Sequence, residues 1–142
     1  MNKANEQSYS AGMTIPVTVA LAAFCGLLLV GLAGRVSMLR MRHKIAFGDG
    51  GNPALMRAIR THGNTAEHAP LFLLLVLAYE LARGTTGFLI GAAVLFVVAR
   101  VLFTAGVLGR GLHTWRMAGA LFTYLAQAAL AVALLLAAAR IL

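Results

Sequence analysis

Three long stretches of this chain carry no charged side chain, and they limit the folds that it can adopt. They cover residues 7–34, 84–99 and 117–139. A helix that crosses a membrane needs about 20 apolar residues, so the first and last stretches qualify by themselves. The middle stretch becomes long enough if Arg100 lies near its end or faces protein. The chain is 61% hydrophobic, which is typical of an integral membrane protein.

The first apolar stretch is predicted to be a permanent span. It is longer than the core of a typical signal peptide and is followed by no clear small-residue cleavage site. Its Cys25 is the single cysteine of the chain, so no disulfide within the chain is possible. We expect Cys25 to be a small buried apolar residue.

Residues 53–82 give the weakest hydropathy signal, because their first half is polar and charged and their apolar run covers only residues 69–79. A single helix over residues 52–83 would be about 45 Å long at 1.5 Å per residue. Such a helix would cross the membrane and project beyond it. It would also carry Arg57, Arg60, Asn64 and Glu67 into or beside the membrane, where polar groups are costly and usually functional.

Turn signals divide the chain into four predicted helices, at about residues 12–45, 53–82, 86–110 and 114–141. The glycine-rich segment at residues 47–53 ends the first helix, and Asn52 and Pro53 are suited to begin the second. Short breaks at residues 83–87 and 109–111 predict an antiparallel, up-down arrangement. We therefore expect one all-α domain over residues 1–142, an integral-membrane four-helix bundle. A bundle this small cannot bury many polar groups alone, so a partner subunit is expected.

The net charge of +8 is distributed unevenly, which argues against nucleic acid as a partner. Eight basic residues fall between the first and second or between the third and fourth apolar runs, against three on the other side. The positive-inside rule then places both basic connections in the cytoplasm and both termini outside it. The eight are Arg35, Arg40, Arg42, Lys44, Arg57, Arg60, Arg110 and Arg116, and the three are Lys3, Arg83 and Arg140.

A polar stripe on the second predicted helix is the main candidate for a ligand site. Arg57, Arg60, Asn64, Glu67 and His68 fall within about 100° of arc, because each helical residue turns about 100°. Arginine binds carboxylates through a planar fork, asparagine offers donors and an acceptor, and glutamate can bind an ammonium group. The stripe could therefore hold a zwitterionic, peptide-like molecule. The alternative is an internal ladder of ion pairs that stabilises the helix. His62 and Glu80 lie roughly on the opposite side.

Other candidates have two interpretations each. Arg100, inside the third span, is either a salt-bridge partner of Glu67 or Glu80 or a ligand clamp, and the two roles are compatible. Arg116 is either a charge anchor at the membrane boundary or a functional cation. The segment Gly48-Asp49-Gly50-Gly51 either forms a tight turn or presents N–H groups to an anion.

The four histidines lack metal-site spacing, so no metal is expected. The chain also contains neither a Walker loop nor a GxSxG motif.

The run from Arg57 to Pro70, preceded by the Gly-Asp-Gly-Gly segment, resembles the MAPEG family, the membrane-associated proteins in eicosanoid and glutathione metabolism, in its bacterial branch. Its core has the spacing RxxxNxxExxP at Arg60, Asn64, Glu67 and Pro70. The resemblance covers about residues 15–135 and includes Arg35, Arg40, Arg100, Gly106 and Arg116. It implies a homotrimer of four-helix protomers, with three glutathione sites between neighbouring subunits at the cytoplasmic end.

The resemblance also implies roles for individual residues. Arg60, Asn64 and Glu67 match positions that contact glutathione, and His62 and Arg100 match positions near it. Arg116 resembles the arginine that stabilises the glutathione thiolate, since a nearby cation favours the thiolate form. Glutathione would be the co-substrate, and its acceptor would be a hydrophobic electrophile that arrives from the lipid side. The expected ligand-binding residues are Arg35, Arg57, Arg60, His62, Asn64, Glu67, Arg100 and Thr104, with Arg116 as the catalytic residue.

Three departures from the family pattern lead to a competing hypothesis. Phe103 and Val107 stand where members often carry His or Tyr, and His68 replaces an aromatic residue that often follows the glutamate. Thr104 is the hydroxyl that remains near them. The sequence predicts a membrane-bound glutathione transferase or peroxidase in a bacterial inner membrane. The alternative is a non-catalytic MAPEG-fold protein that binds another anionic ligand or lipid. A small multidrug transporter is disfavoured, because the first span lacks the membrane-embedded carboxylate such transporters use.

Overall fold

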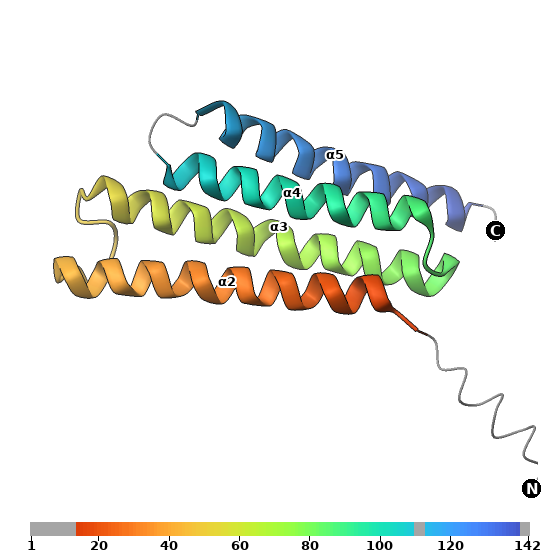
Figure 1. The fold of residues 1–142 in the computed structure, drawn as a ribbon, viewed down its shortest axis with the longest axis horizontal. Helices are drawn as coiled ribbons and strands as arrows, with labels where there is room; N and C mark the ends of the chain where they lie inside the picture. Colours follow the sequence, from red (N-terminus) through yellow and green to blue (C-terminus); the bar gives the residue numbers. More distant parts are fainter. Residues whose placement is uncertain (1–13, 110–112, 140–142) are drawn as a thin grey trace, which may run out of the picture.

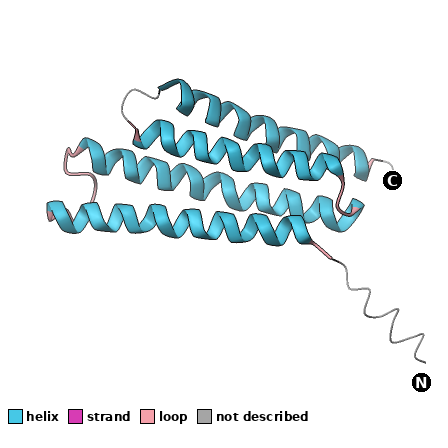
Figure 2. Ribbon diagram, in the orientation of Figure 1, coloured by secondary structure: helices cyan, strands magenta, loops and turns pink. Residues whose placement is uncertain are grey.

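The described residues form a bundle of four antiparallel α-helices (Figure 1). The structure is a computed structural model that describes residues 14–109 and 113–139. The helices are α2 (Pro16–His43), α3 (Pro53–Arg83), α4 (Gly87–Leu108) and α5 (His113–Ala138). Short loops join α2 to α3 and α3 to α4, as Figure 2 shows. Each helix is long and apolar enough to cross a membrane. The predicted all-α, up-down membrane bundle is therefore confirmed.

The two ends of the bundle differ in what they contain. The loop between α2 and α3, the end of α4 and the start of α5 lie at one end, which we call the loop end. The start of α2, the end of α5 and the turn between α3 and α4 lie at the other, which we call the terminal end. α3 contacts all three other helices. Side chains of α3 therefore decide how the bundle is connected across its width.

The helix boundaries agree with the predicted ones to within four residues. α2 begins at Pro16, not at residue 12, and ends at His43, because Lys44 has a left-handed backbone with φ of 55°. α3 begins at Pro53 as predicted, and Oδ1 of Asn52 accepts hydrogen bonds from the N–H groups of Ala54 (2.9 Å) and Leu55 (3.1 Å). The predicted helix ends at residues 12, 110 and 141 lie outside the described residues.

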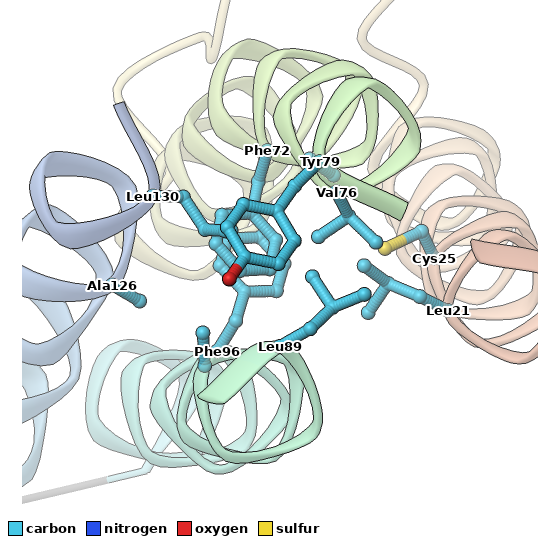
Figure 3. Close-up of a cluster of buried hydrophobic side chains, with 11 residues drawn as sticks. Leu21, Cys25, Phe72, Val76, Tyr79, Leu89, Phe96, Ala126 and Leu130 are labelled. Carbon is cyan, nitrogen blue, oxygen red and sulfur yellow. The ribbon is translucent and has the colours of Figure 1, made fainter. Parts of the chain in front are cut away.

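The apolar core lies between the four helices, in the half of the bundle that is nearer the terminal end. Phe72 of α3 and Phe96 of α4 stack at its centre, with ring centroids 4.0 Å apart and planes 7° apart. Cys25 of α2 is buried beside them, as predicted. Figure 3 shows how all four helices contribute to this cluster. Its other labelled members are Leu21, Val76, Tyr79, Leu89, Ala126 and Leu130.

Glu80 joins α3 to the first turn of α2 at the terminal end. Its carboxylate is 2% exposed and accepts hydrogen bonds from the N–H groups of Val17 (3.1 Å) and Thr18 (2.8 Å). The hydroxyls of Thr18 and Thr85 donate to it as well, each at 2.7 Å. The first N–H groups of a helix have no partner within the helix, and the N-cap residue of α2 supplies none. Glu80 therefore caps α2 from a neighbouring helix.

The glycine-rich segment between α2 and α3 is a tight turn. Gly48, Gly50 and Gly51 have φ angles of 64°, 55° and 72°, and the N–H of Gly51 donates to Oδ1 of Asp49 at 3.0 Å. Arg40 holds the loop by donating to the carbonyl oxygens of Ala46 (3.1 Å) and Gly48 (2.9 Å). Of the two interpretations of this segment, the structure supports the turn.

α4 and α5 approach each other so closely that only glycine fits at two contact points. A Cβ atom on Gly119 would lie 2.7 Å from the carbonyl oxygen of Ala99 and 2.7 Å from Cα of Phe103. A Cβ atom on Gly106 would lie 2.7 Å from Cα of Arg116. These distances are far below van der Waals contact, and both involve backbone atoms that cannot rotate away. Small residues allow membrane helices to pack this closely.

We predict that Gly119→Ala destabilises the protein. The added methyl group forces α4 and α5 apart, and overpacking of this kind costs about 1–3 kcal/mol. Thermal unfolding of the purified protein in mild detergent measures the change. Gly91→Ala in α4 is the matched control, because a Cβ there meets nothing within 4 Å. Equal melting temperatures for the two variants would contradict the close helix contact.

Candidate functional site

The structure divides the polar stripe of α3 between the interior and the surface of the protomer. Asn64 and His68 bind side chains of α4 and α5, whereas Arg60 and Glu67 are exposed and Arg57 is half-buried. Helical geometry explains the division, because the stripe lies beside the buried face of α3 and extends away from it. Its inner edge reaches neighbouring helices and its outer edge does not. The predicted stripe therefore has an inner edge that is hydrogen-bonded to neighbouring helices and an outer edge that is exposed.

Arg100 occupies the centre of the polar part of the bundle. It is 1% exposed, and its Nη1 donates to Oδ1 of Asn64 at 2.9 Å. Its Nη2 donates to Oγ1 of Thr123, whose own hydroxyl donates to the carbonyl oxygen of Gly119 at 2.8 Å. The guanidinium carbon lies 4.9 Å from the ring centroid of Phe103 and 5.7 Å from that of Phe96. Neutral dipoles and aromatic rings therefore stabilise this cation.

Of the two interpretations of Arg100, the salt bridge to Glu67 or Glu80 is wrong within the described residues of the protomer. Glu80 is held at the start of α2, and Glu67 is exposed on the outer edge of the stripe. Across residues 14–109 and 113–139, Arg100 has hydrogen-bond partners on Asn64 and Thr123 and none on a carboxylate. The correction has a physical reason: Glu80 lies on the flank of α3 that borders α2, whereas Asn64 lies on the flank that borders α4 and α5.

The bond from Arg100 fixes the orientation of the Asn64 amide. Arginine can only donate, so the atom of Asn64 that faces it must be the oxygen. The Nδ2 group of Asn64, which carries two N–H donors, therefore points away from Arg100. Asn64 is half-buried at the border between the interior and the exposed edge of the stripe. It can offer N–H donors to a carbonyl or carboxylate oxygen of a ligand.

The exposed edge carries two opposite charges at different depths. Arg60 and Glu67 are seven residues apart on α3, which places them about 10 Å apart along the helix axis. Their spacing is too long for a direct ion pair within one helix face, so each charge is available to a separate group. With Asn64 between them, this edge complements a molecule that has an anionic end, a carbonyl and a cationic end.

Four other predicted residues lie at different places on the protomer. Arg35 is exposed on α2 and lines a groove with Gly31, Gly34 and Arg42. His62 is half-buried and lies eighteen residues, or about five turns, before Glu80. It therefore shares the flank of α3 that borders α2. The side chains of Arg35 and His62 consequently do not join the Arg100–Asn64 pair within one protomer.

Arg116 and Thr104 lie nearer the loop end than Arg100 does. Arg116 is half-buried, and its Nη2 lies 3.4 Å from Nδ1 of His113. Its backbone is held against α4 by the close contact with Gly106. Oγ1 of Thr104 is buried one turn from Arg100. In the described part of the chain, neither this oxygen nor Nε of Arg100 has a hydrogen-bond partner.

The sequence analysis missed Thr123 and Gln127, which connect α5 to the site. Thr123 accepts from Arg100, and Gln127 binds His68 through Nδ1 (3.0 Å) and through the His68 carbonyl oxygen (3.2 Å). A signal was present. These two residues stand four apart in the uncharged run of α5, and polar groups in a membrane span are costly unless they are paired.

Comparison with known proteins agrees with the geometry. The MAPEG family matches residues 18–136 of the chain. A relative from Escherichia coli (strain K12), the inner membrane protein YecN, is 33% identical over 110 residues, which cover 78% of this chain and 83% of the relative. The protein of the same name from Escherichia coli O6:H1 has the same identity and coverage.

We predict that substitutions of Asn64 separate into two classes by stability. Asn64→Ala leaves Nη1 of the buried Arg100 without its acceptor, and an unsatisfied buried group costs about 1–3 kcal/mol, or more when it is charged. Asn64→Asp supplies a carboxylate to the same cation, so the melting temperature should remain at or above that of the wild type. Thr104→Val is the control that should change little, since its hydroxyl has no partner in the described residues. A fully stable Asn64→Ala protein would contradict the role of this bond.

Proposed function

The chain belongs to the MAPEG family, and on that basis we propose that it is a membrane-bound glutathione transferase or peroxidase that acts on hydrophobic electrophiles. One observation carries the proposal: Arg100 holds Asn64 so that its N–H donors lie between the exposed charges of Arg60 and Glu67. Glutathione has matching groups, because it is a tripeptide with two carboxylates, an ammonium group and amide carbonyls. Arg60 binds a carboxylate, Asn64 a carbonyl or carboxylate oxygen, and Glu67 the ammonium group.

A homotrimer is part of the proposal, because one protomer leaves the site incomplete. Arg60 and Glu67 are exposed on a helix of membrane-spanning length, where lipid offers no hydrogen-bond partners. Arg35 and His62 face other directions within the same protomer. In a trimer with sites between neighbours, Arg35 of one subunit can complete the site of the next. Arg57, Arg100 and Thr104 then contribute charge and support around the bound peptide, whereas His62 lies on the flank of α3 that borders α2.

Arg116 is proposed to stabilise the glutathione thiolate. It lies at the loop end, half-buried and placed by the Gly106 contact, where water can accept the proton that the thiol loses. A nearby cation lowers the pKa of a thiol and raises the fraction of nucleophilic thiolate. The thiolate sulfur then attacks an electrophilic carbon and displaces a leaving group. Alternatively, it attacks the terminal oxygen of a hydroperoxide, and the departing alkoxide takes up a proton to form an alcohol. A second glutathione then reduces the sulfenic product to give glutathione disulfide and water.

Phe103 favours a second candidate function. Its ring lies against the Arg100 guanidinium at 4.9 Å and offers no hydrogen bond to a ligand. A protein that keeps the polar stripe but has apolar side chains at residues 103 and 107 of α4 can bind an anionic ligand or lipid without activating a thiol. The two candidates differ in one observable, which is the presence of a thiolate on bound glutathione.

The proposed location is a bacterial inner membrane, with the loop end in the cytoplasm and both termini outside it. A relative is described as an inner membrane protein. The loop end carries most of the basic residues of the described chain, and the positive-inside rule assigns such an end to the cytoplasm. Arg110, Lys3 and Arg140 were also counted in the charge distribution of the sequence, but they lie outside the described residues.

We predict that native mass spectrometry in mild detergent gives a complex of three chains that binds up to three glutathione molecules. Asn64→Asp should keep the trimer and lose the glutathione, because the carboxylate replaces the N–H donors and repels the ligand carboxylates. Because Asn64→Asp is expected to remain folded, a loss of glutathione binding in this variant cannot be ascribed to unfolding. A monomer would exclude the shared site, and undiminished binding by Asn64→Asp would exclude this ligand surface.

We also predict that Arg116→Ala raises the pKa of the bound glutathione thiol. The thiolate absorbance near neutral pH should fall while most of the binding is retained, because the carboxylate and ammonium contacts remain. Each pKa unit corresponds to about 1.4 kcal/mol of differential stabilisation. Arg83→Ala removes a cation at the terminal end and is the matched control, with wild-type absorbance expected. Wild-type protein that binds glutathione without any thiolate signal would favour the non-catalytic candidate.

A further inference from the structure

A second polar cluster lies deeper along the same edge of the bundle. It consists of His68 on α3 and Tyr124 and Gln127 on α5, and we call it the His68 cluster. His68 follows Asn64 by four residues, or about 6 Å along the helix axis, in the direction of the terminal end. The surface around the cluster is apolar, with Leu71, Leu121 and Leu125 each about half exposed. Neither the glutathione contacts nor the Arg100 network uses these three polar side chains.

The hydrogen bonds of Gln127 fix the tautomer of His68. Nε2 of Gln127 donates to the backbone carbonyl oxygen of His68 at 3.2 Å, so the amide nitrogen of Gln127 is the atom on that side. The amide oxygen, Oε1, therefore faces Nδ1 of His68 at 3.0 Å. An amide oxygen can only accept, so Nδ1 must carry the proton. In the neutral imidazole, Nε2 then has a free lone pair and acts as an acceptor.

This acceptor reaches the surface of the protomer. Two fully buried side-chain atoms in the described residues lack a partner, Nε of Arg100 and Oγ1 of Thr104. Within residues 14–109 and 113–139, the ring of His68 makes its hydrogen bond through Nδ1, so Nε2 has no partner there. Because Nε2 is nevertheless absent from the buried atoms without a partner, it must be accessible at the surface. Tyr124 is 53% exposed, and its ring lies beside that of His68 with centroids 5.4 Å apart and a 54° tilt. The ring of His68, with its Nε2 acceptor, and the exposed side chain of Tyr124 therefore lie beside each other at this surface.

We propose that the His68 cluster binds the O–H group of an apolar, membrane-soluble molecule, with that group donating to Nε2 of His68 and accepting from the Tyr124 hydroxyl. The ligand must bring its own hydrogen-bonding group, because lipid chains offer none at this depth. Because Nε2 of His68 accepts, the ligand group must donate a hydrogen bond, which a hydroxyl or hydroperoxide does and the oxygen atoms of an ionised carboxylate or phosphate do not.

A ligand with an O–H group would be the second substrate of the proposed reaction, and this role rests on the proposed function. An O–H group at His68 lies about one helical turn from the Asn64 donors, on the same edge of α3. A hydroperoxide held there would present its oxygen atoms to a thiol bound at the glutathione surface. Binding of the O–H group itself does not require glutathione, so it is measured without glutathione, and its failure leaves the glutathione prediction untouched.

The test is ¹⁵N-histidine NMR of the full chain in lipid nanodiscs, titrated with dodecanol and with dodecyl methyl ether. The two probes share their apolar chain and differ in the O–H donor. Dodecanol should shift the Nε2 resonance of His68 and bind about fivefold to tenfold more tightly than the ether, as expected for one net hydrogen bond. Dodecyl hydroperoxide should bind more tightly than the ether, as dodecanol does. The tighter binder of the alcohol and the hydroperoxide identifies which O–H group the site prefers.

Two histidine variants on opposite flanks of α3 make the test specific. His68→Gln should abolish the preference for the alcohol, whereas His62→Gln should leave it unchanged. Tyr124→Phe should weaken the alcohol binding while the His68 resonance still responds to it. Equal affinities for alcohol and ether in the wild type would overturn the proposal. A preference that survives His68→Gln would overturn it as well, because the O–H group would then be bound elsewhere.

Discussion

The buried guanidinium of Arg100 determines how the other helices of this bundle are arranged. A cation in a membrane span is costly, and here no carboxylate in the described residues neutralises it. Its stability depends on neutral acceptors from two other helices, Asn64 on α3 and Thr123 on α5, and on the faces of Phe96 and Phe103. Because hydrogen bonds to charged groups contribute about 1.5–3 kcal/mol each, the cation ties α3, α4 and α5 together.

That arrangement is possible only because α4 and α5 touch through glycine. Gly119 lies against the backbone of Ala99, which directly precedes Arg100, and of Phe103, which follows Arg100 by three residues. The carbonyl oxygen of Gly119 accepts a hydrogen bond from the Thr123 hydroxyl. This bond turns the lone pairs of Thr123 Oγ1 toward Arg100. A larger side chain at residue 119 would move Thr123 away from the cation. The polar network and the small-residue contact are therefore parts of one structure, although they involve different kinds of force.

The sequence was sufficient for the fold and for part of the site. Charge-free runs gave the spans, and Asn52 with Pro53 gave the start of α3 to the residue, because both signals are local. The partner of Arg100 was predicted wrongly, because helical periodicity gives the direction of a side chain but not the helix that it meets. Glu80 had the charge to pair with Arg100, but its flank of α3 borders α2, where unpaired N–H groups take it. Thr123 and Gln127 were missed because their neutral side chains do not interrupt the hydropathy of α5.

The division of the polar stripe explains how one helix face can contribute to stability and still present polar atoms at the surface. The inner edge, with Asn64 and His68, is hydrogen-bonded to α4 and α5. The outer edge, with Arg60 and Glu67, is unengaged within the protomer. Asn64 and His68 belong to both, since each uses one polar atom inward and keeps another for the surface. Their inward bonds determine whether the outward atom donates or accepts: Asn64 is left as a donor and His68 as an acceptor. Buried polar contacts thus fix the chemistry of the exposed edge before any ligand binds.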